Sequence, residues 1–446
     1  MSEKRSSIAL FLIGTFAMTQ IRFIGSIGIS ELAMSVMAPF LFARDARELR
    51  RDGFFPVIFL VGLTCFSCMI SSYFNDTPME WAVRGIAAPY VILSSIIVIH
   101  HYIRINLNGL KWLLLGLAFS SIINIFVFHG ATEAYIAAMR GDGGVESIVS
   151  GPLFWINRIS NFATLPLRGW FLQTPYLISL ITPFILAIYS LFFSVSGRAA
   201  ALICFFSFII LLVGGKTVRK MKRLQRNFFF LLMVMALSAI GMKAIYKELA
   251  QSGALGEKAQ QKYEAQTKSG SDILSLIIAG RVDCFVGLMA CLDKPLIGHG
   301  PWAIDTEHYY ERFLHDYGAA EDYEKYYEEK IMMAKMGVGE RITLIPGHSH
   351  FISGWLWYGL PGLLMWVYVF VVGITVVRKY IASVPQWFGY FAVAIPGMLW
   401  HFVFSPPGSR VQDACMIVCF LMARAVGQGR IGLTAEMHKE IYEVEK

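Results

Sequence analysis

Three side chains of this sequence stand where an apolar segment meets a charged one: His348, Arg198 and Arg281. His348 lies where a charged segment re-enters a long apolar run, so its imidazole is expected at the mouth of a membrane helix. A neutral imidazole can take up a proton near neutral pH. A guanidinium is permanently charged and matches phosphate oxygens with a planar fork. One base and two fixed cations at a membrane surface indicate chemistry on a phosphate-bearing lipid.

Each of these residues also has a purely structural interpretation. Arg198 could be an interfacial arginine whose head reaches the headgroup region. Arg281 could pair with Asp283, although residues two apart on a helix do not face each other. His348 could be an ordinary loop histidine, and His350, two residues further on, is a rival candidate for the base.

The sequence offers no recognisable metal or cofactor motif. It has no D-x-D motif, no phosphate-cradling glycine-rich loop and no zinc-ligand spacing; Asp305–Glu307 and Asp322–Glu324 are the nearest approaches. We therefore expect neither a metal nor a cofactor. The tyrosine-rich and acidic segment 302–341 is typical of a solvated lid, or of a surface whose tyrosines stack on sugar rings.

Composition fixes the class of protein. Hydrophobic residues make up 56% of the 446 residues and charged residues only 16%, whereas soluble proteins carry about 25% charged residues. The net charge of +8 does not indicate nucleic acid, because the basic residues cluster in short segments between apolar runs, as topology signals do. The sequence predicts an all-α, polytopic membrane protein.

Apolar runs of about 20 residues mark the membrane-spanning helices. The runs lie at 7–24, 26–43, 55–73, 82–101, 110–128, 172–194, 198–213, 227–245, 350–376, 385–404 and 409–425. Two arginine- and lysine-rich segments, 44–51 and 216–226, are expected as cytoplasmic loops by the positive-inside rule. Both can be cytoplasmic only if one more crossing exists, for which 144–170 is the best place. We therefore predict about 12 spans with both ends of the chain cytoplasmic.

This topology gives one large external loop. Residues 246–348 form it, and its apolar part at 273–292 is expected to lie as an interfacial helix, because Arg281 and Asp283 would each cost a few kcal/mol inside lipid. Arg198, Arg281 and His348 then reach the same external face. The predicted organisation is a transmembrane bundle (1–245), the external loop (246–348), C-terminal spans (349–430) and a cytoplasmic tail (431–446).

Three segments resemble the O-antigen ligase and O-antigen polymerase superfamily of bacterial envelopes. Ser194–Leu202 (SVSGRAAAL) is similar to the Ser-Arg-Gly-Ala helix start of the family. Gly280-Arg281, with Asp293–Gly300 (DKPLIGHG), is similar to its Arg…Asp-x-Pro-Leu-x-Gly-x-Gly stretch. His348–Ile352 (HSHFI), with Gly359–Gly362 (GLPG), resembles its His-Asn-x-x-Leu…Gly-x-x-Gly stretch. Ser349 stands where the family usually has Asn. The resemblance covers roughly residues 170–380.

The resemblance implies a GT-C-like fold and transfer of a saccharide from undecaprenyl diphosphate to a glycan acceptor, at the periplasmic face of the bacterial inner membrane. His348 would be the catalytic base, with His350 a secondary candidate, and Arg198 and Arg281 would bind the diphosphate. The transfer would be metal-independent and inverting. The acceptor is a second lipid-linked glycan in a polymerase, which we favour, or lipid A core in a ligase. A transporter or flippase for a lipid-linked saccharide is the competing class.

Overall fold

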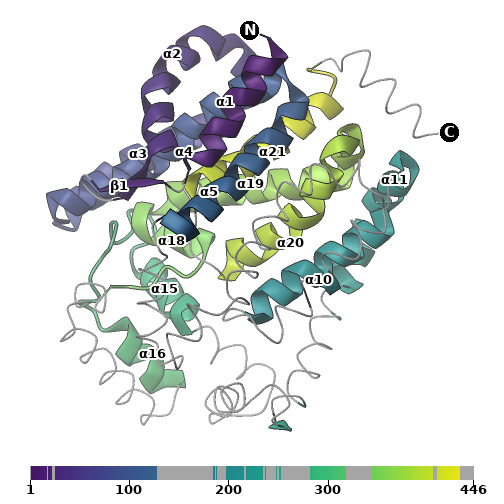
Figure 1. The fold of residues 1–446 in the computed structure, drawn as a ribbon. Helices are drawn as coiled ribbons and strands as arrows, with labels where there is room; N and C mark the ends of the chain where they lie inside the picture. The colour runs from purple at the N-terminus through teal and green to yellow at the C-terminus, as the bar shows by residue number, and fades with distance from the viewer. Residues whose placement is uncertain are drawn as a thin grey trace.

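The computed structural model describes residues 2–17, 19–22, 26–127, 197–214, 217–234, 282–317, 344–404 and 409–431, with a few single positions between them. Over these residues the chain is mostly α-helical, as predicted (Figure 1). The exception is an antiparallel pair of short strands, β1 (Gln20–Arg22) and β2 (Ser26–Gly28), in which Gln20 pairs with Gly28. Predicted crossings at 144–170 and, except for single positions, 172–194 lie outside the described residues.

The helices have the following bounds. They are α1 (Glu3–Thr15), α2 (Ile29–Arg51), α3 (Phe55–Phe74), α4 (Met79–Ile105), α5 (Leu110–Val127), α10 (Gly197–Gly214), α11 (Val218–Arg226), α15 (Val282–Asp293), α16 (Tyr309–Tyr317), α18 (His350–Tyr358), α19 (Leu360–Lys379), α20 (Phe388–Phe404) and α21 (Arg410–Gly427). Short 3₁₀ turns η1 (Leu107–Gly109), η4 (Ile381–Ser383) and η5 (Pro385–Trp387) connect them.

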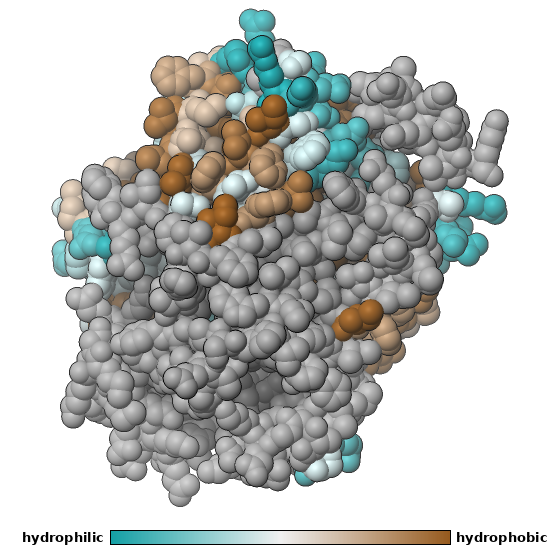
Figure 2. Space-filling model, viewed as in Figure 1, coloured by the Kyte–Doolittle hydropathy of each residue, from teal (hydrophilic) through white to brown (hydrophobic). Residues whose placement is uncertain are grey.

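Four of the described helices are long and apolar enough to cross a membrane: α3, α4, α19 and the η5–α20 segment Pro385–Phe404. The outer face of α3 exposes large apolar side chains, with Phe59 61% and Phe66 59% exposed, while Val57 and Val61 on its other face are fully buried. Figure 2 shows apolar surface over the N-terminal helices bordering hydrophilic surface at the top of the view. Such an apolar outer surface needs lipid around it, and the chain is therefore a membrane protein.

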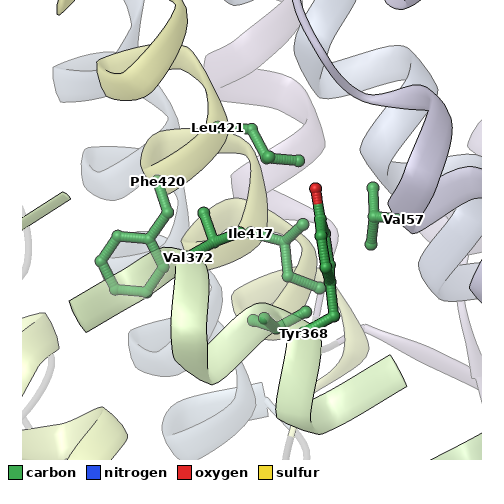
Figure 3. A pocket seen from close by; sticks show the side chains of 7 residues that line it. Val57, Tyr368, Val372, Ile417, Phe420 and Leu421 are labelled. Carbon is green, nitrogen blue, oxygen red and sulfur yellow. The ribbon is translucent and has the colours of Figure 1, made fainter. Parts of the chain in front are cut away.

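Helices from the N-terminal and C-terminal parts of the described chain pack together in one bundle. Helix α4 packs against α2, α3 and α21, and α19 packs against α3. Figure 3 shows one of these contacts, where Val57, Tyr368, Val372, Ile417 and Phe420 meet and leave no room for a water molecule. The close approach of α1 and α5 depends on Gly14 and Gly116, since a Cβ on either would overlap backbone atoms of the other helix.

The predicted span 7–24 is wrong in its shape. Helix α1 ends at Thr15, and the chain then reverses through β1 and β2 instead of continuing as a helix. Polar residues Thr19, Gln20 and Arg22 interrupt the apolar run, and the strand pairing satisfies backbone groups that the helix no longer covers.

The two arginine-rich segments expected as loops are helical. Residues 44–51 form the last turns of α2, and Arg50 and Arg51 in its last turn are favoured by the negative end of the helix dipole. Residues 218–226 form α11, which buries Val218, Met221 and Leu224 at helical spacing and exposes its basic residues.

The predicted span 350–376 is not one helix. It breaks at Gly359, whose backbone φ is +65°, and α18 folds back along α19. The rings of His350 and Trp366, from the two helices, lie 4.7 Å apart. Gly354 and Gly362 permit this hairpin, because a Cβ on Gly354 would lie 2.8 Å from the Gly362 carbonyl oxygen. Gly359 lies at one end of the bundle. Because α18 runs back from it alongside α19, the start of α18 lies further inside the bundle than Gly359 does.

We expect Gly359→Ala to destabilise the protein by about 1–3 kcal/mol, because alanine is strained at positive φ and its Cβ would overlap the Leu296 carbonyl oxygen. Thermal unfolding of the purified protein in detergent measures the loss. Gly62→Ala in α3 is the matched control, since nothing lies within 4 Å of its Cβ position. Equal unfolding midpoints for the two variants would contradict this account of the hairpin.

Candidate functional site

The candidate site is built around His348 and Asp283. His348 Nε2 lies 3.3 Å from Asp283 Oδ2, with the two side chains 47% and 38% exposed. Asp283 stands in the first turn of α15, and the next residue, Cys284, donates its thiol to the His348 carbonyl oxygen at 3.4 Å. The start of α15 is thus held against the segment that leads into α18. Half-exposed side chains in an ion pair remain able to meet a ligand.

Ser349 fixes the backbone beside His348. Its hydroxyl accepts a hydrogen bond from Ile352 N at 3.0 Å, which makes it the N-cap of α18. The same hydroxyl donates to the Phe402 carbonyl oxygen at 3.0 Å, and the residue is buried. Serine therefore caps the helix and ties it to α20 at the position where the resembling family usually has asparagine.

His350 has a different environment from His348. Its ring is buried, stacks on Phe402 at 5.1 Å and meets the edge of Trp366. Its Nδ1 donates to the His401 carbonyl oxygen at 3.0 Å, and its Nε2 lies 3.4 Å from Asp413 Oδ1. This ring joins α18 to α20 and α21. Such packing leaves it poorly placed to meet a substrate, so the rival candidate for the base is better explained as a structural residue.

The arginine candidates are only partly described. Arg198 lies in the first turn of α10, with its side chain outside the described structure. Helix α10 packs against α20, and Gly214 at its end meets the ring of Phe388 at the start of α20, so the two helices run antiparallel. The first turn of α10 therefore lies at the end of α20 that touches His350. Arg281 lies outside the described residues; its neighbour in sequence, Val282, begins α15.

The motif Asp293–Gly300 positions the site without joining it. Gly298 has a φ of +75° and leaves no room for a Cβ beside the Leu356 carbonyl oxygen, to which His299 N donates at 2.6 Å. His299 Nε2 donates to the Ala290 carbonyl oxygen at 2.8 Å. Burial lowers the pKa of His299, so the ring is held neutral. The motif locks the end of α15 to the end of α18.

Sequence reasoning missed several charged residues at this end of the bundle. Asp413 forms an ion pair with His350, and Glu31 forms one with Arg410, whose Nε lies 3.3 Å from the Glu31 carboxylate. Glu31 and Asp413 are buried and fall inside two predicted spans. A carboxylate inside an apolar run is a functional or structural signal by itself, so both could have been singled out from the sequence.

Among the described residues no three His, Cys, Asp or Glu side chains are grouped so as to hold a metal ion. Comparisons with protein-family models, with curated proteins and with solved structures find no match for this chain.

We expect His350→Ala to cost about 3–5 kcal/mol of stability, because it removes one partner of a buried pair and leaves the Asp413 carboxylate uncompensated. Denaturant or thermal unfolding of the purified protein in detergent measures this loss of stability. Glu311→Ala is the control, since Glu311 pairs with His308 at 3.6 Å on the surface, and its loss should cost less than about 1 kcal/mol. A His350→Ala protein as stable as the control would show that the buried pair contributes nothing.

The stability of the α15–α18 contact should fall in acid. The folded-state pKa of His299 is depressed by burial, so the unfolded state takes up the proton first and stability is lost as the pH falls below the ordinary imidazole value of about 6.5. Unfolding midpoints of wild-type and His299→Gln protein between pH 8 and 5 test this. The variant should lose less stability in acid than the wild type; parallel pH curves would contradict the expectation.

Proposed function

We propose that this chain is a glycosyltransferase that moves a saccharide from undecaprenyl diphosphate to a glycan acceptor at the periplasmic face of the bacterial inner membrane, as a polymerase of lipid-linked glycans. The observation that carries the proposal is the His348–Asp283 pair, half-exposed and 3.3 Å apart. Val282, the residue after Arg281 in sequence, begins α15, and the first turn of α10, which carries Arg198, lies at the end of α20 that touches His350. The motif order of the resembling superfamily gives the same assignment.

The geometry suits His348 to general-base catalysis. Because Nε2 lies 3.3 Å from the Asp283 carboxylate, Nδ1 is the ring nitrogen left to accept a proton from a substrate. For Nδ1 the described part of the chain provides no hydrogen-bond partner. The carboxylate orients the ring and stabilises the imidazolium that forms after proton uptake.

The proposed reaction is a single displacement. Nδ1 of His348 takes the proton of the acceptor hydroxyl, and the oxygen attacks the anomeric carbon of the donor. The bond between that carbon and the diphosphate oxygen breaks, and its electron pair leaves with undecaprenyl diphosphate. Arg198 and Arg281 would hold the negative charge of this leaving group with preorganised guanidinium groups. Attack opposite the leaving group inverts the anomeric configuration.

Orientation is supported by the distribution of basic residues. The arginine-rich end of α2 packs against the end of α4 that carries Arg104, and Gly85 near the other end of α4 meets Pro301 and Tyr358. By the positive-inside rule the arginine-rich end is cytoplasmic. The end that carries His348 then faces the periplasm, where the lipid-linked donor is expected.

We expect His348→Ala to lower the transfer rate by about 10²–10⁴-fold, the usual contribution of a general base. Asp283→Asn should lose less, because the ring keeps a hydrogen-bond acceptor. Arg198→Lys and Arg281→Lys should recover little of the activity lost in the alanine variants, since lysine lacks the planar fork. The assay is release of undecaprenyl diphosphate by the purified protein from a lipid-linked donor and acceptor, with His308→Ala as a control that stays active.

Product analysis separates the alternatives. A polymerase lengthens lipid-linked glycans, whereas a ligase requires lipid A core as the acceptor. A transporter releases no free undecaprenyl diphosphate with either acceptor, and that result would overturn the proposal. Full activity of His348→Ala would remove the histidine from the mechanism, and acid–base help would then have to come from another group.

A further inference from the structure

A second polar centre lies at the other end of the bundle from His348. An open cavity of about 350 Å³ is lined by Arg44, Asp45, Glu48, His101, Arg104 and Ile105, where the last turns of α2 and α4 meet. From Gly85, which contacts the His348 end through Tyr358, to Ile105, helix α4 rises about 30 Å at 1.5 Å per residue. The cavity is therefore separate from the proposed active site.

Most of the carboxylates near the cavity are already paired with basic side chains of the protein. Asp45 accepts from Arg44 Nε at 2.9 Å and lies 2.6 Å from His101 Nδ1. Burial by itself raises the pKa of Asp45, but the hydrogen bonds and charges of Arg44 and His101 outweigh it and lower the pKa. Asp52, whose side chain is fully buried, lies 3.0 Å from Nε of the cavity-lining Arg104.

Three groups keep unused capacity toward the cavity. Arg104 uses only Nε in its ion pair, so its two terminal nitrogens can donate to a ligand. Arg44 uses Nε and one terminal nitrogen, which leaves the other. Glu48 has no ion pair and no side-chain hydrogen bond within the described residues. The cavity thus offers the guanidinium groups of Arg44 on α2 and Arg104 on α4, and the unpaired carboxylate of Glu48, one helical turn from Arg44 on α2.

Beside the cavity, the outer face of α2 offers a surface suited to a lipid chain. Val36, Phe40 and Arg44 follow one another at four-residue steps along a ridge of α2. Val36 is 61% and Phe40 75% exposed. From Arg44 to Val36 this ridge runs about 12 Å along the outer surface of α2, away from the cavity. An acyl chain lying along this ridge would bring its headgroup to Arg44.

We infer that this cavity binds the headgroup of a zwitterionic phospholipid of the phosphoethanolamine type. The phosphate would be held by the terminal nitrogens of Arg44 and Arg104, and the primary ammonium would be held by Glu48. A lining with unused guanidinium nitrogens and an unpaired carboxylate fits a headgroup with both charges better than a purely anionic one. The inference does not depend on the proposed glycosyl transfer.

The test measures lipid retention by the purified full-length protein. Native mass spectrometry is carried out after exchange into equal amounts of phosphatidylethanolamine, phosphatidylglycerol and phosphatidylcholine with identical acyl chains. We expect retention of phosphatidylethanolamine to exceed that of phosphatidylglycerol by about threefold to fivefold, the range of a partly exposed ion pair. Glu48→Gln should abolish that preference without reducing retention of phosphatidylglycerol. Arg44→Gln should lower retention of all three lipids.

Arg47→Gln is the matched control, because Arg47 is exposed on the same helix and does not line the cavity. It should leave the lipid profile unchanged. Competition with soluble O-phosphoethanolamine distinguishes a lipid from a free headgroup: millimolar competitor should displace little lipid, because the ridge residues contribute. Equal retention of phosphatidylethanolamine and phosphatidylglycerol by the wild type, or equal effects of Arg44→Gln and Arg47→Gln, would overturn the inference.

Discussion

The described structure depends on close backbone contact between the loop after α15 and the turn that joins α18 to α19. Leu360 N donates to the Leu296 carbonyl oxygen at 3.2 Å, and His299 N donates to the Leu356 carbonyl oxygen at 2.6 Å. Side chains at Gly298 or Gly359 would fill the space that these bonds occupy. The same turn receives Ser67 of α3, whose hydroxyl donates to the Tyr358 carbonyl oxygen at 2.6 Å. One glycine-based contact thus fixes α15, α18 and α19 relative to the membrane-spanning bundle.

Buried charge sets a second constraint. Asp52, with His100, Arg104 and Arg51 around it, and Glu31, with Arg410, are carboxylates taken out of water inside an apolar bundle. For Asp52, burial alone raises the pKa, and its cationic neighbours reverse the shift and lower it. Such pairs contribute little net stability, but loss of one partner is costly. The main effect of these ion pairs is therefore to fix how α2, α4 and α21 are positioned relative to one another.

The sequence predicts the uninterrupted helices well and the interrupted ones poorly. The helices expected at 55–73 and 110–128 agree with α3 and α5 to within a residue or so, and of these two α3 is among the described helices long and apolar enough to cross a membrane. The break at Gly359 was missed, since a glycine in an apolar run shows its positive φ only once its neighbours are placed. His348 could be singled out by its type and position. Its partner Asp283 could not, because contact between residues so far apart in the chain depends on the fold.

The hairpin of α18 and α19 also bears on chemistry. Because α18 folds back from Gly359, its first residues reach the level of Trp366, about two turns into α19. His348, two residues before α18, therefore lies beside this part of the bundle, with its side chain half-exposed. Helix α15 runs alongside and brings Asp283 to the same depth. A single straight helix over 350–376 would have carried His348 away from α15, so the glycine turn is what brings His348 and Asp283 together.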